Sequence, residues 1–228
     1  MSEQIKTRKV IGLNGGPRKN WNTASLLEEA LKGAASTGAE TKLIHLYDLD
    51  YKGCRSCFSC KTKENYLKGR CALKDELSSV LELLEDCTGA VMGSPIYLSD
   101  VTGALRSFLE RYIFINLAYD FDAPSVLKRG PAIGLIYSMN VPETLIETMG
   151  YDVLFRSQAN FFSRLNPPVF EQLLSCDTYQ FSDYSRYHAP MFDEAHKRAV
   201  KETQFPQDLK LAYEMGARIG QTGFGDGK

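Results

Sequence analysis

Cysteines give this 228-residue chain its clearest potential for chemistry. Four of its six cysteines lie close together, at Cys54, Cys57, Cys60 and Cys71. Iron–sulfur clusters are held by four thiolates, often with repeated two-residue spacing. Zinc sites with four cysteines usually split into two separated pairs. The pattern therefore leaves three interpretations open: an iron–sulfur cluster, a zinc ion, or free thiols that take part in redox chemistry.

A glycine-rich turn near the N-terminus is the second chemical feature. The apolar run Val10–Asn14 predicts a strand, Gly15–Arg18 predicts a tight turn, and an amphipathic helix follows. The turn amides and the positive end of the helix dipole converge where such a helix begins, which favours an anion. Arg18 adds a guanidinium suited to phosphate, and Asn22 or Thr23 can cap the helix or donate to phosphate oxygens. The turn predicts a phosphorylated ligand.

The turn lacks both common nucleotide signatures. No lysine follows a glycine at the spacing of a Walker loop, and Gly12, Gly15 and Gly16 have the wrong offsets for a dinucleotide fingerprint. We therefore expect the phosphate of a mononucleotide. An ordinary strand-to-helix turn is the alternative, because glycines and capping residues serve such turns in any protein.

Composition is typical of a globular protein without a charged partner. Hydrophobic residues make up 43% of the chain, charged residues 24%, and the net charge is −1. This balance gives no reason to expect nucleic acid. The sequence contains neither a signal-peptide pattern nor an apolar run long enough to span a bilayer, so we expect a cytoplasmic protein that does not bind membranes. Cysteines in that compartment are thiols or metal ligands rather than disulfides.

Strand and helix patterns alternate along the chain. The apolar patterns predict strands at 10–14, 41–47, 89–93, 131–137 and 169–176. They predict helices at 24–35, 77–87, 101–112, within 143–162, and at 193–219, with a break in the last near Pro206. Repeated strand–helix units build a parallel sheet with helices on both faces. With the ligand turn after the first strand, we expect a flavodoxin-like, three-layer α/β/α fold with a five-stranded sheet in the order 2-1-3-4-5.

We expect one domain over residues 1–176, with a cysteine-rich loop at 51–72, and a C-terminal extension over 177–228. Within the extension, residues 177–193 fit neither strand nor helix. They carry five aromatic rings, at Tyr179, Phe181, Tyr184, Tyr187 and Phe192. Rings in such a segment must be buried against something. The alternatives are packing on the same domain, a subunit interface, and a lid over the ligand.

Two motifs in the same order as in a known family give the chain a resemblance over about residues 8–140. They are Asn14-Gly-Gly-Pro-Arg-x-x-x-Asn-Thr23 and Gly93-Ser-Pro-Ile-Tyr-x-x-x-Val-Thr-Gly-x-x-Arg-x-Phe-x-Glu-Arg111. The pair resembles the NAD(P)H-dependent FMN reductase family, and the cysteine loop resembles its iron–sulfur flavoprotein branch. The resemblance implies that the FMN phosphate is bound by Gly16, Pro17, Arg18, Asn22 and Thr23. It implies that the isoalloxazine ring lies along Pro95, Ile96, Tyr97 and Leu98, and is reached at its other edge by Ser138, Met139 and Asn140.

The resemblance also bears on the cysteines, which in that branch hold a [4Fe-4S] cluster. It makes Cys54, Cys57, Cys60 and Cys71 the candidate ligands, although the gap before Cys71 is longer than the branch usually shows. We expect the four cysteines to lie near the flavin edge, because their loop leaves the same end of the sheet as both FMN loops. Two further departures affect the phosphate contacts. The family usually has serine in place of Gly16 and glycine in place of Trp21.

The function implied by the resemblance is an FMN-dependent oxidoreductase. Electrons would pass from NAD(P)H through FMN to a small acceptor such as a quinone, flavin or azo compound. Because the flavin itself accepts the hydride, no catalytic side chain is required. Two alternatives are an iron–sulfur flavoprotein that carries electrons and a non-enzymatic module that senses redox state through flavin or thiols. We expect FMN rather than FAD, and a homodimer or homotetramer.

Overall fold

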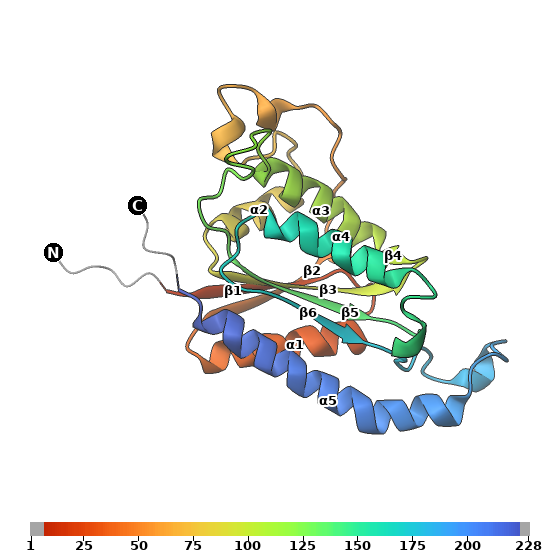
Figure 1. Ribbon diagram of the computed structural model, residues 1–228. Helices are drawn as coiled ribbons and strands as arrows, with labels where there is room; N and C mark the ends of the chain where they lie inside the picture. The colour runs from red at the N-terminus through yellow and green to blue at the C-terminus, as the bar shows by residue number, and fades with distance from the viewer. Residues whose placement is uncertain (1–6, 224–228) are drawn as a thin grey trace.

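A single sheet lies between two helical layers in the computed structural model, which describes residues 7–223 (Figure 1). Five parallel strands have the spatial order β2-β1-β3-β5-β6. Their bounds are β1 Lys9–Asn14, β2 Glu40–His45, β3 Gly89–Tyr97, β5 Ala132–Ser138 and β6 Phe170–Ser175. Taken in chain order, these five strands give 2-1-3-4-5, so the expected flavodoxin-like fold is confirmed. The sheet also has a two-residue strand that the sequence did not predict, β4 (Asp100–Val101), which pairs antiparallel with the end of β3.

Helices cover both faces of the sheet (Figure 1). The first layer contains α2 (Leu77–Glu85), α3 (Gly103–Asn116) and α4 (Tyr151–Ser163). The second contains α1 (Asn22–Ser36) and α5 (Glu194–Gln221). Among residues 7–223, none of the helices combines the length and the apolar character that a bilayer crossing requires.

The sheet separates two hydrophobic cores. Under α2, α3 and α4 the larger core includes Leu13 and Ile133, and under α1 and α5 the smaller core includes Val10 and Ile136. In each strand, the two residues named here are an odd number of positions apart and lie in opposite cores, as the alternation of side chains along a strand requires. Strands that are covered on both faces become almost continuously apolar, as β1, β3 and β5 are.

The predicted break of the last helix is wrong, because α5 runs without interruption through Pro206. A proline inside a helix removes one backbone hydrogen bond and crowds the preceding turn. Tertiary contacts hold this helix together on both sides of that defect. Asp193 caps its N-terminus by accepting from two amides of the first turn, and beyond Pro206 the helix buries Ala212, Met215 and Ile219 in the smaller core. The helix expected within 143–162 is also different from the prediction: it is shorter, because Gly150, with φ of 71°, immediately precedes α4.

Helices α1 and α5 touch through their backbones. A Cβ atom on Gly216 of α5 would lie 1.7 Å from the carbonyl oxygen of Ala30 in α1. One on Gly33 of α1 would lie 1.9 Å from the carbonyl oxygen of Tyr213 in α5. Only glycine permits so close an approach, so these two positions fix the crossing of the helices. Because α1 begins at the glycine-rich turn, this crossing also fixes where that turn lies.

Replacing Gly216 by alanine is expected to lower the free energy of unfolding by about 1–3 kcal/mol, since overpacking against backbone atoms cannot be relieved by a side-chain rotation. Gly103→Ala is the matched control, because a Cβ on this helical glycine meets nothing within 4 Å. The control should be neutral or more stable by up to about 1 kcal/mol. Urea unfolding of both variants measures the difference, and equal stability would contradict the packing argument.

Candidate functional site

A cleft opens at the carboxyl edge of the sheet, where β1, β3 and β5 end. It encloses about 630 Å³, counting the space open to solvent. Its lining residues are Gly16, Pro17, Arg18, Trp21, Asn22, Thr23, Pro95, Ile96, Tyr97, Ser138, Met139, Asn140, Thr178 and Gln180. The structure thus brings together, from three separate loops, all but one of the residues that the sequence assigned to the ligand.

Leu98 is the exception, because it does not line the cleft. Leu98 and Ser99 form the turn between β3 and β4, and both have positive φ, of 50° and 63°. This left-handed turn leaves the Leu98 side chain fully exposed to solvent. The expected contact of Leu98 with a ring in the cleft therefore does not follow from this geometry, whereas Pro95, Ile96 and Tyr97 do line it.

The first loop is held by its backbone. The amide of Gly15 donates to the Gly93 carbonyl oxygen at 2.7 Å, and the amide of Gly16 donates to Asn14 Oδ1 at 2.8 Å. The Thr102 hydroxyl donates to the Gly15 carbonyl oxygen at 2.5 Å and also caps the N-terminus of α3. One buried threonine therefore ties the first loop to β3 and α3. These bonds keep the loop in a single position beside the cleft.

The N-terminus of α1 faces the cleft without a side-chain cap. Trp21 occupies the capping position and makes no capping hydrogen bond, so the expected cap from Asn22 or Thr23 is wrong. Their side chains have other partners: Asn22 Nδ2 donates to the Tyr179 carbonyl oxygen at 3.0 Å, and the hydroxyls of Thr23 and Ser138 are 2.7 Å apart. The first turn contains no acidic residue. Its amides, which have no partner within the helix, can therefore bind an anion.

Arg18 links the first loop to the segment at 177–193. Its Nη1 donates to the Gln180 carbonyl oxygen at 2.8 Å, and its guanidinium lies 4.3 Å from the centre of the Trp21 ring. Partial burial lowers the pKa of Arg18, but a guanidinium remains protonated in proteins. The cleft thus has a fixed positive charge next to the uncapped helix end, with further N–H groups left for a ligand.

The segment at 177–193 packs within the chain and forms one wall of the cleft. The rings of Tyr179 and Tyr184 lie 4.9 Å apart, and those of Phe181 and Tyr187 lie 4.3 Å apart. Two residues of this segment, Thr178 and Gln180, reach the cleft. The sequence analysis missed both residues. The aromatic rings signalled burial, but a segment without periodicity carries no signal of which side chains face a ligand.

Two polar atoms on the cleft lining are buried without a hydrogen-bond partner among the described residues: Trp21 Nε1 and Asn140 Oδ1. The backbone around Asn140 is held firmly, because its carbonyl oxygen accepts from the buried Lys197 ammonium at 2.8 Å. Unpaired buried polar atoms are costly in a finished structure. A lining with such atoms, an anion-binding helix end and the apolar surface of Pro95 and Ile96 fits a phosphorylated ligand with a flat polar ring.

The four clustered cysteines line a second, smaller cavity. Cys60 is buried, Cys54 and Cys71 are half-buried, and Cys57 is exposed. Burial raises the pKa of the Cys60 thiol. Within residues 7–223, no group of three or more His, Cys, Asp or Glu residues is arranged to hold a metal ion. The donor types suit an iron–sulfur cluster, and the shared cavity brings all four to one place.

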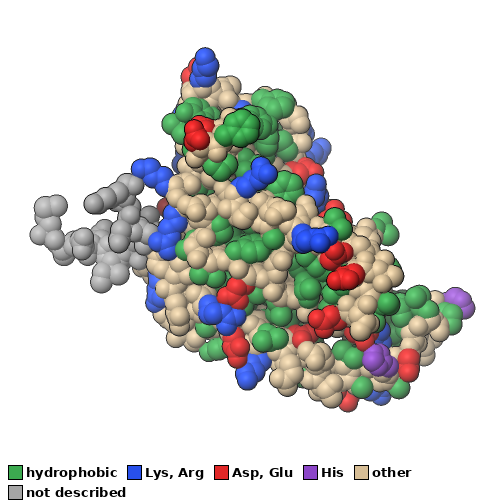
Figure 2. Space-filling view, in the orientation of Figure 1, with side chains coloured by type: hydrophobic (Ala, Val, Ile, Leu, Met, Phe, Trp, Pro, Cys, Tyr) green, Lys and Arg blue, Asp and Glu red, His purple; other side chains and the backbone are tan. Residues whose placement is uncertain are grey.

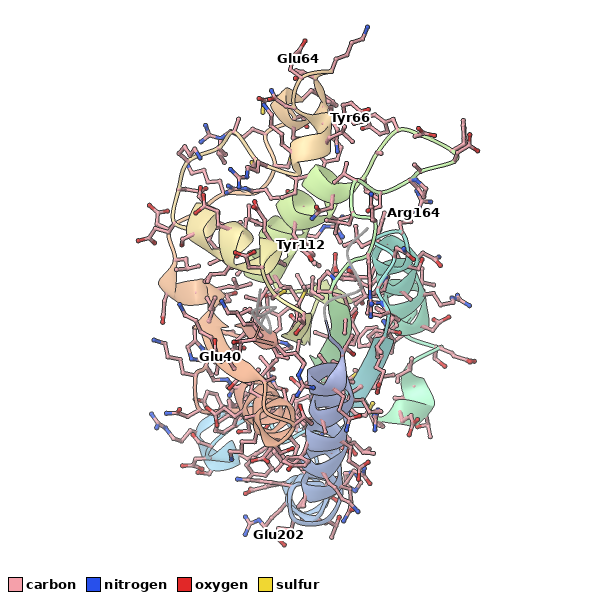
Figure 3. The ribbon with its side chains drawn as sticks, turned by 90° about the vertical axis from the view of Figure 1, so that its left-hand side faces the viewer. Glu40, Glu64, Tyr66, Tyr112, Arg164 and Glu202 are labelled. Atoms are coloured by element: carbon pink, nitrogen blue, oxygen red, sulfur yellow. The ribbon has the colours of Figure 1, made fainter. Side chains whose placement is uncertain are left out.

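The cysteine loop runs along α3 and forms a lobe above it (Figures 1 and 2). Three contacts mark its course: Tyr51 Oη donates to the Ala104 carbonyl oxygen at 2.5 Å, the Cys54 amide donates to the Glu110 carboxylate at 3.2 Å, and Lys61 Nζ donates to the Phe114 and Leu117 carbonyl oxygens. In the view turned by 90°, Glu64 and Tyr66 lie at the tip of the lobe, beyond Tyr112 of α3 (Figure 3).

This course contradicts the expectation that the cysteines lie near the flavin edge. The loop does leave the carboxyl edge of the sheet, but α3 carries it away from that edge. The cysteine cavity and the cleft share no lining residue, since the cavity contacts α3 at Arg111, Phe114 and Ile115. The first loop beside the cleft instead contacts the other end of α3, where the Thr102 hydroxyl donates to the Gly15 carbonyl oxygen. Sequence order alone did not reveal the direction that the loop takes.

The profile of the family described as NADPH-dependent FMN reductase matches residues 8–140, more than half of the chain. The chain belongs to this family. An iron-sulfur flavoprotein of Methanocaldococcus jannaschii is 35% identical over 103 residues, which are 45% of this chain and 51% of that protein. An iron-sulfur flavoprotein of Archaeoglobus fulgidus is 36% identical over 103 residues, 45% of this chain and 48% of that protein. The chain thus spans about half the length of these curated relatives.

Solved structures of other proteins show the same fold. An azoreductase from Bacillus anthracis superposes with a TM-score of 0.64 at 13% identity, covering 93% of this chain and 100% of that chain. An NAD(P)H:quinone oxidoreductase from Methanothermobacter marburgensis superposes with a TM-score of 0.63 at 15% identity, covering 96% and 100%. At these identities the likeness concerns the fold alone. It agrees with the strand order of this chain.

Thr102→Val is expected to lower the free energy of unfolding by about 1–2 kcal/mol, because it removes the cap of α3 and leaves the Gly15 carbonyl oxygen without its hydroxyl donor. Thr102→Ser keeps the hydroxyl and should retain most of the stability. Urea unfolding of the two variants separates the hydroxyl from the methyl group. A loss of the same size in both would show that packing, rather than the hydrogen bond, holds the first loop.

Proposed function

We propose that the protein is an FMN-dependent oxidoreductase that takes electrons from NADH or NADPH and passes them to a small acceptor such as a quinone, flavin or azo compound. The observation that carries this proposal is the cleft itself. It combines the uncapped N-terminus of α1, the Arg18 guanidinium and the apolar surface at Pro95 and Ile96 in one site. Membership of the FMN reductase family supports FMN as the ligand of that site.

Different cleft residues would bind different parts of the FMN molecule. The amides at the start of α1, together with Arg18, would bind the phosphate by charge-assisted hydrogen bonds. Pro95 and Ile96 would support one face of the isoalloxazine ring, and the unpaired Asn140 Oδ1 would accept from a polar group of the ring. When bound, FMN supplies the hydride and electron transfer, so the protein's contribution is binding and orientation. Tyr97, nearly half exposed, stands at the rim where a donor or acceptor would enter.

The experiment that tests this proposal is a flavin titration followed by reduction. Apoprotein should bind FMN more tightly than riboflavin or FAD, and NADH or NADPH should bleach the bound flavin under anaerobic conditions. Trp21 is the one tryptophan of the sequence and lines the cleft, so its fluorescence reports binding directly. Absence of FMN binding would overturn the proposal. Tight binding with no reduction by either nucleotide would favour an electron carrier or a non-enzymatic redox sensor.

Arg18→Ala should weaken FMN binding by about 1–3 kcal/mol, the scale of a charge-assisted hydrogen bond. The affinity for riboflavin, which lacks the phosphate, should stay unchanged and serves as the control. Trp21 fluorescence measures both affinities in the same protein. If FMN and riboflavin weakened equally, Arg18 would act by holding the wall at Gln180 rather than by binding phosphate.

For the cysteine cavity we propose a [4Fe-4S] cluster held by Cys54, Cys57, Cys60 and Cys71. The position of all four cysteines on the wall of one cavity supports it, as do curated relatives that are named iron-sulfur flavoproteins. The cluster would supply single-electron transfer, and the protein would supply the four thiolate ligands. Zinc and free redox-active thiols are the competing occupants of the loop.

Protein purified without oxygen should contain iron and acid-labile sulfide, and Cys57→Ser should reduce both sharply. Cys176→Ser is the matched control. Burial raises the pKa of Cys176 to about 12, and this thiol lies outside the cysteine cavity. Elemental analysis and visible absorption measure the result. Zinc in place of iron, or no metal after anaerobic reconstitution, would contradict the cluster.

Assembly and location belong to the same proposal. We infer a homodimer or homotetramer in the cytoplasm, with a small molecule as the electron acceptor. Light scattering that shows a monomer at micromolar concentration would contradict the assembly.

A further inference from the structure

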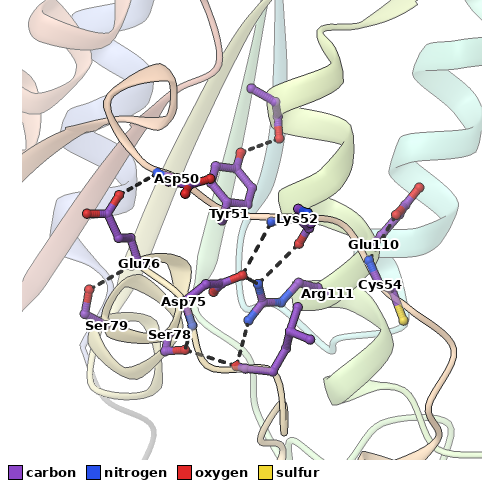
Figure 4. Close-up of polar contacts among 12 residues, drawn as sticks. Asp50, Tyr51, Lys52, Cys54, Asp75, Glu76, Ser78, Ser79, Glu110 and Arg111 are labelled. Atoms are coloured by element: carbon purple, nitrogen blue, oxygen red, sulfur yellow. Dashed lines mark hydrogen bonds and ion pairs between the residues drawn. The ribbon is translucent and has the colours of Figure 1, made fainter.

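A single buried guanidinium joins the two ends of the cysteine loop. Arg111 lies on α3, and its side chain has no exposed surface. Its Nη1 donates to the Lys52 carbonyl oxygen and its Nη2 donates to the Leu73 carbonyl oxygen, both at 3.2 Å (Figure 4). Lys52 lies two residues before Cys54, and Leu73 lies two residues after Cys71. One side chain therefore closes the stretch of chain that contains all four cysteines.

The positive charge of the Arg111 guanidinium is compensated by the carboxylate of Asp75. Arg111 Nη1 lies 2.5 Å from Asp75 Oδ2, and the same carboxylate oxygen accepts from the Lys52 amide at 3.4 Å. Asp75 lies just before α2 and contacts its first turn, because the Asp75 amide donates to Ser78 Oγ at 3.2 Å. Arg111 and Asp75 thus connect the loop to both α2 and α3. Breaking a buried pair leaves the remaining charge unpaired, so the arrangement resists replacement of one partner.

One nitrogen of the Arg111 guanidinium has no acceptor. Its Nε is buried and has no hydrogen-bond partner among the described residues. Arg111 also lines the cysteine cavity, together with all four cysteines and Phe114 of the same helix. A buried N–H without a partner is costly, and hydrogen bonds to cluster sulfurs are one of the features that set the potential of an iron–sulfur centre. The cavity therefore has a cation and a free N–H in its wall.

We propose that Arg111 is the positioning residue of the cysteine loop. It fixes both ends of the loop so that the four thiols face one cavity, and its Nε donates to a sulfur atom when the cavity is filled. The closure of the loop is independent of any occupant. The contact with sulfur rests on the [4Fe-4S] cluster that we propose as part of the function.

The closure is tested in the apoprotein by hydrogen exchange followed by mass spectrometry. Arg111→Lys keeps a positive charge but cannot bridge two carbonyl oxygens with a planar fork. Amides in peptides covering 52–73 should exchange at least about ten times faster in this variant, whereas peptides covering the first loop should be unchanged. Arg70→Lys is the matched control, because Arg70 belongs to the same loop but pairs with Glu85 on the surface. Unchanged exchange in Arg111→Lys would overturn the closure.

The contact with sulfur is tested on reconstituted protein by iron retention and by the reduction potential. Arg111→Met should bind iron about 10- to 100-fold more weakly, the usual effect of removing a group that orients metal ligands. Its potential should become more negative, because a positive charge and an N–H donor that favour the reduced cluster are lost. Arg111→Lys should restore part of the potential, since it restores the charge. The Arg70→Lys control should match the wild type in both measurements.

The outcomes separate this inference from the cluster proposal. Arg111→Met with wild-type iron retention and potential would overturn the sulfur contact. If the wild-type protein takes up no iron, the cluster proposal and the sulfur contact fail together, while the exchange measurement still decides the closure. If Arg111→Met does not fold, as judged by circular dichroism, the potential of Arg111→Lys decides: a value equal to that of the wild type would overturn the role of the Nε donor.

Discussion

The hydrogen bond from Thr102 to the Gly15 carbonyl oxygen anchors both the cleft and the helix that supports the cysteine lobe. It holds the first loop in place and, through the same side chain, begins α3. Farther along, α3 presents Arg111 to the cysteine loop, and its last turn binds Lys61 of that loop. One helix therefore sets the position of two sites, and its register depends on a threonine at its start.

A helix end lies at the cleft and another at the cysteine loop, and the two ends have partial charges of opposite sign. At the cleft, the uncapped N-terminus of α1 offers positive partial charge to a ligand. At the lobe, the carbonyl oxygens that end α3 have already found a cation in Lys61, whose ammonium also lies 4.6 Å from the centre of the Phe114 ring. Burial lowers the pKa of Lys61, yet its two carbonyl partners favour the charged form. The first helix end is left open for a ligand, while the second is used to hold the fold together.

Local patterns in the sequence were sufficient for the strand order, and the resemblance to the FMN reductase family supplied most of the cleft residues. Arg18, Pro95 and Asn140 lie at or just beyond the carboxyl ends of central strands, and the topology of a parallel sheet must bring those ends together. What failed depends on contacts between distant segments. The continuity of α5 through Pro206 reflects tertiary packing, and the role of Arg111 reflects carbonyl oxygens 59 and 38 residues earlier in the chain. A sequence pattern contains no direct record of such partners.

The length of α3 separates the two sites. Thr102 and Arg111 are nine residues apart, which corresponds to about 14 Å along a helix axis. The side chains that α3 buries between them, such as Leu105 and Phe108, belong to the larger hydrophobic core, and Cys60 of the lobe packs in that same core. The exposed tip of the lobe, with its lysine-rich insert, lies outside the core and shares no lining residue with the cleft. Changes in length are therefore expected to be tolerated at the tip of the lobe, whereas changes at its base would reach the core that α3 shares with the sheet.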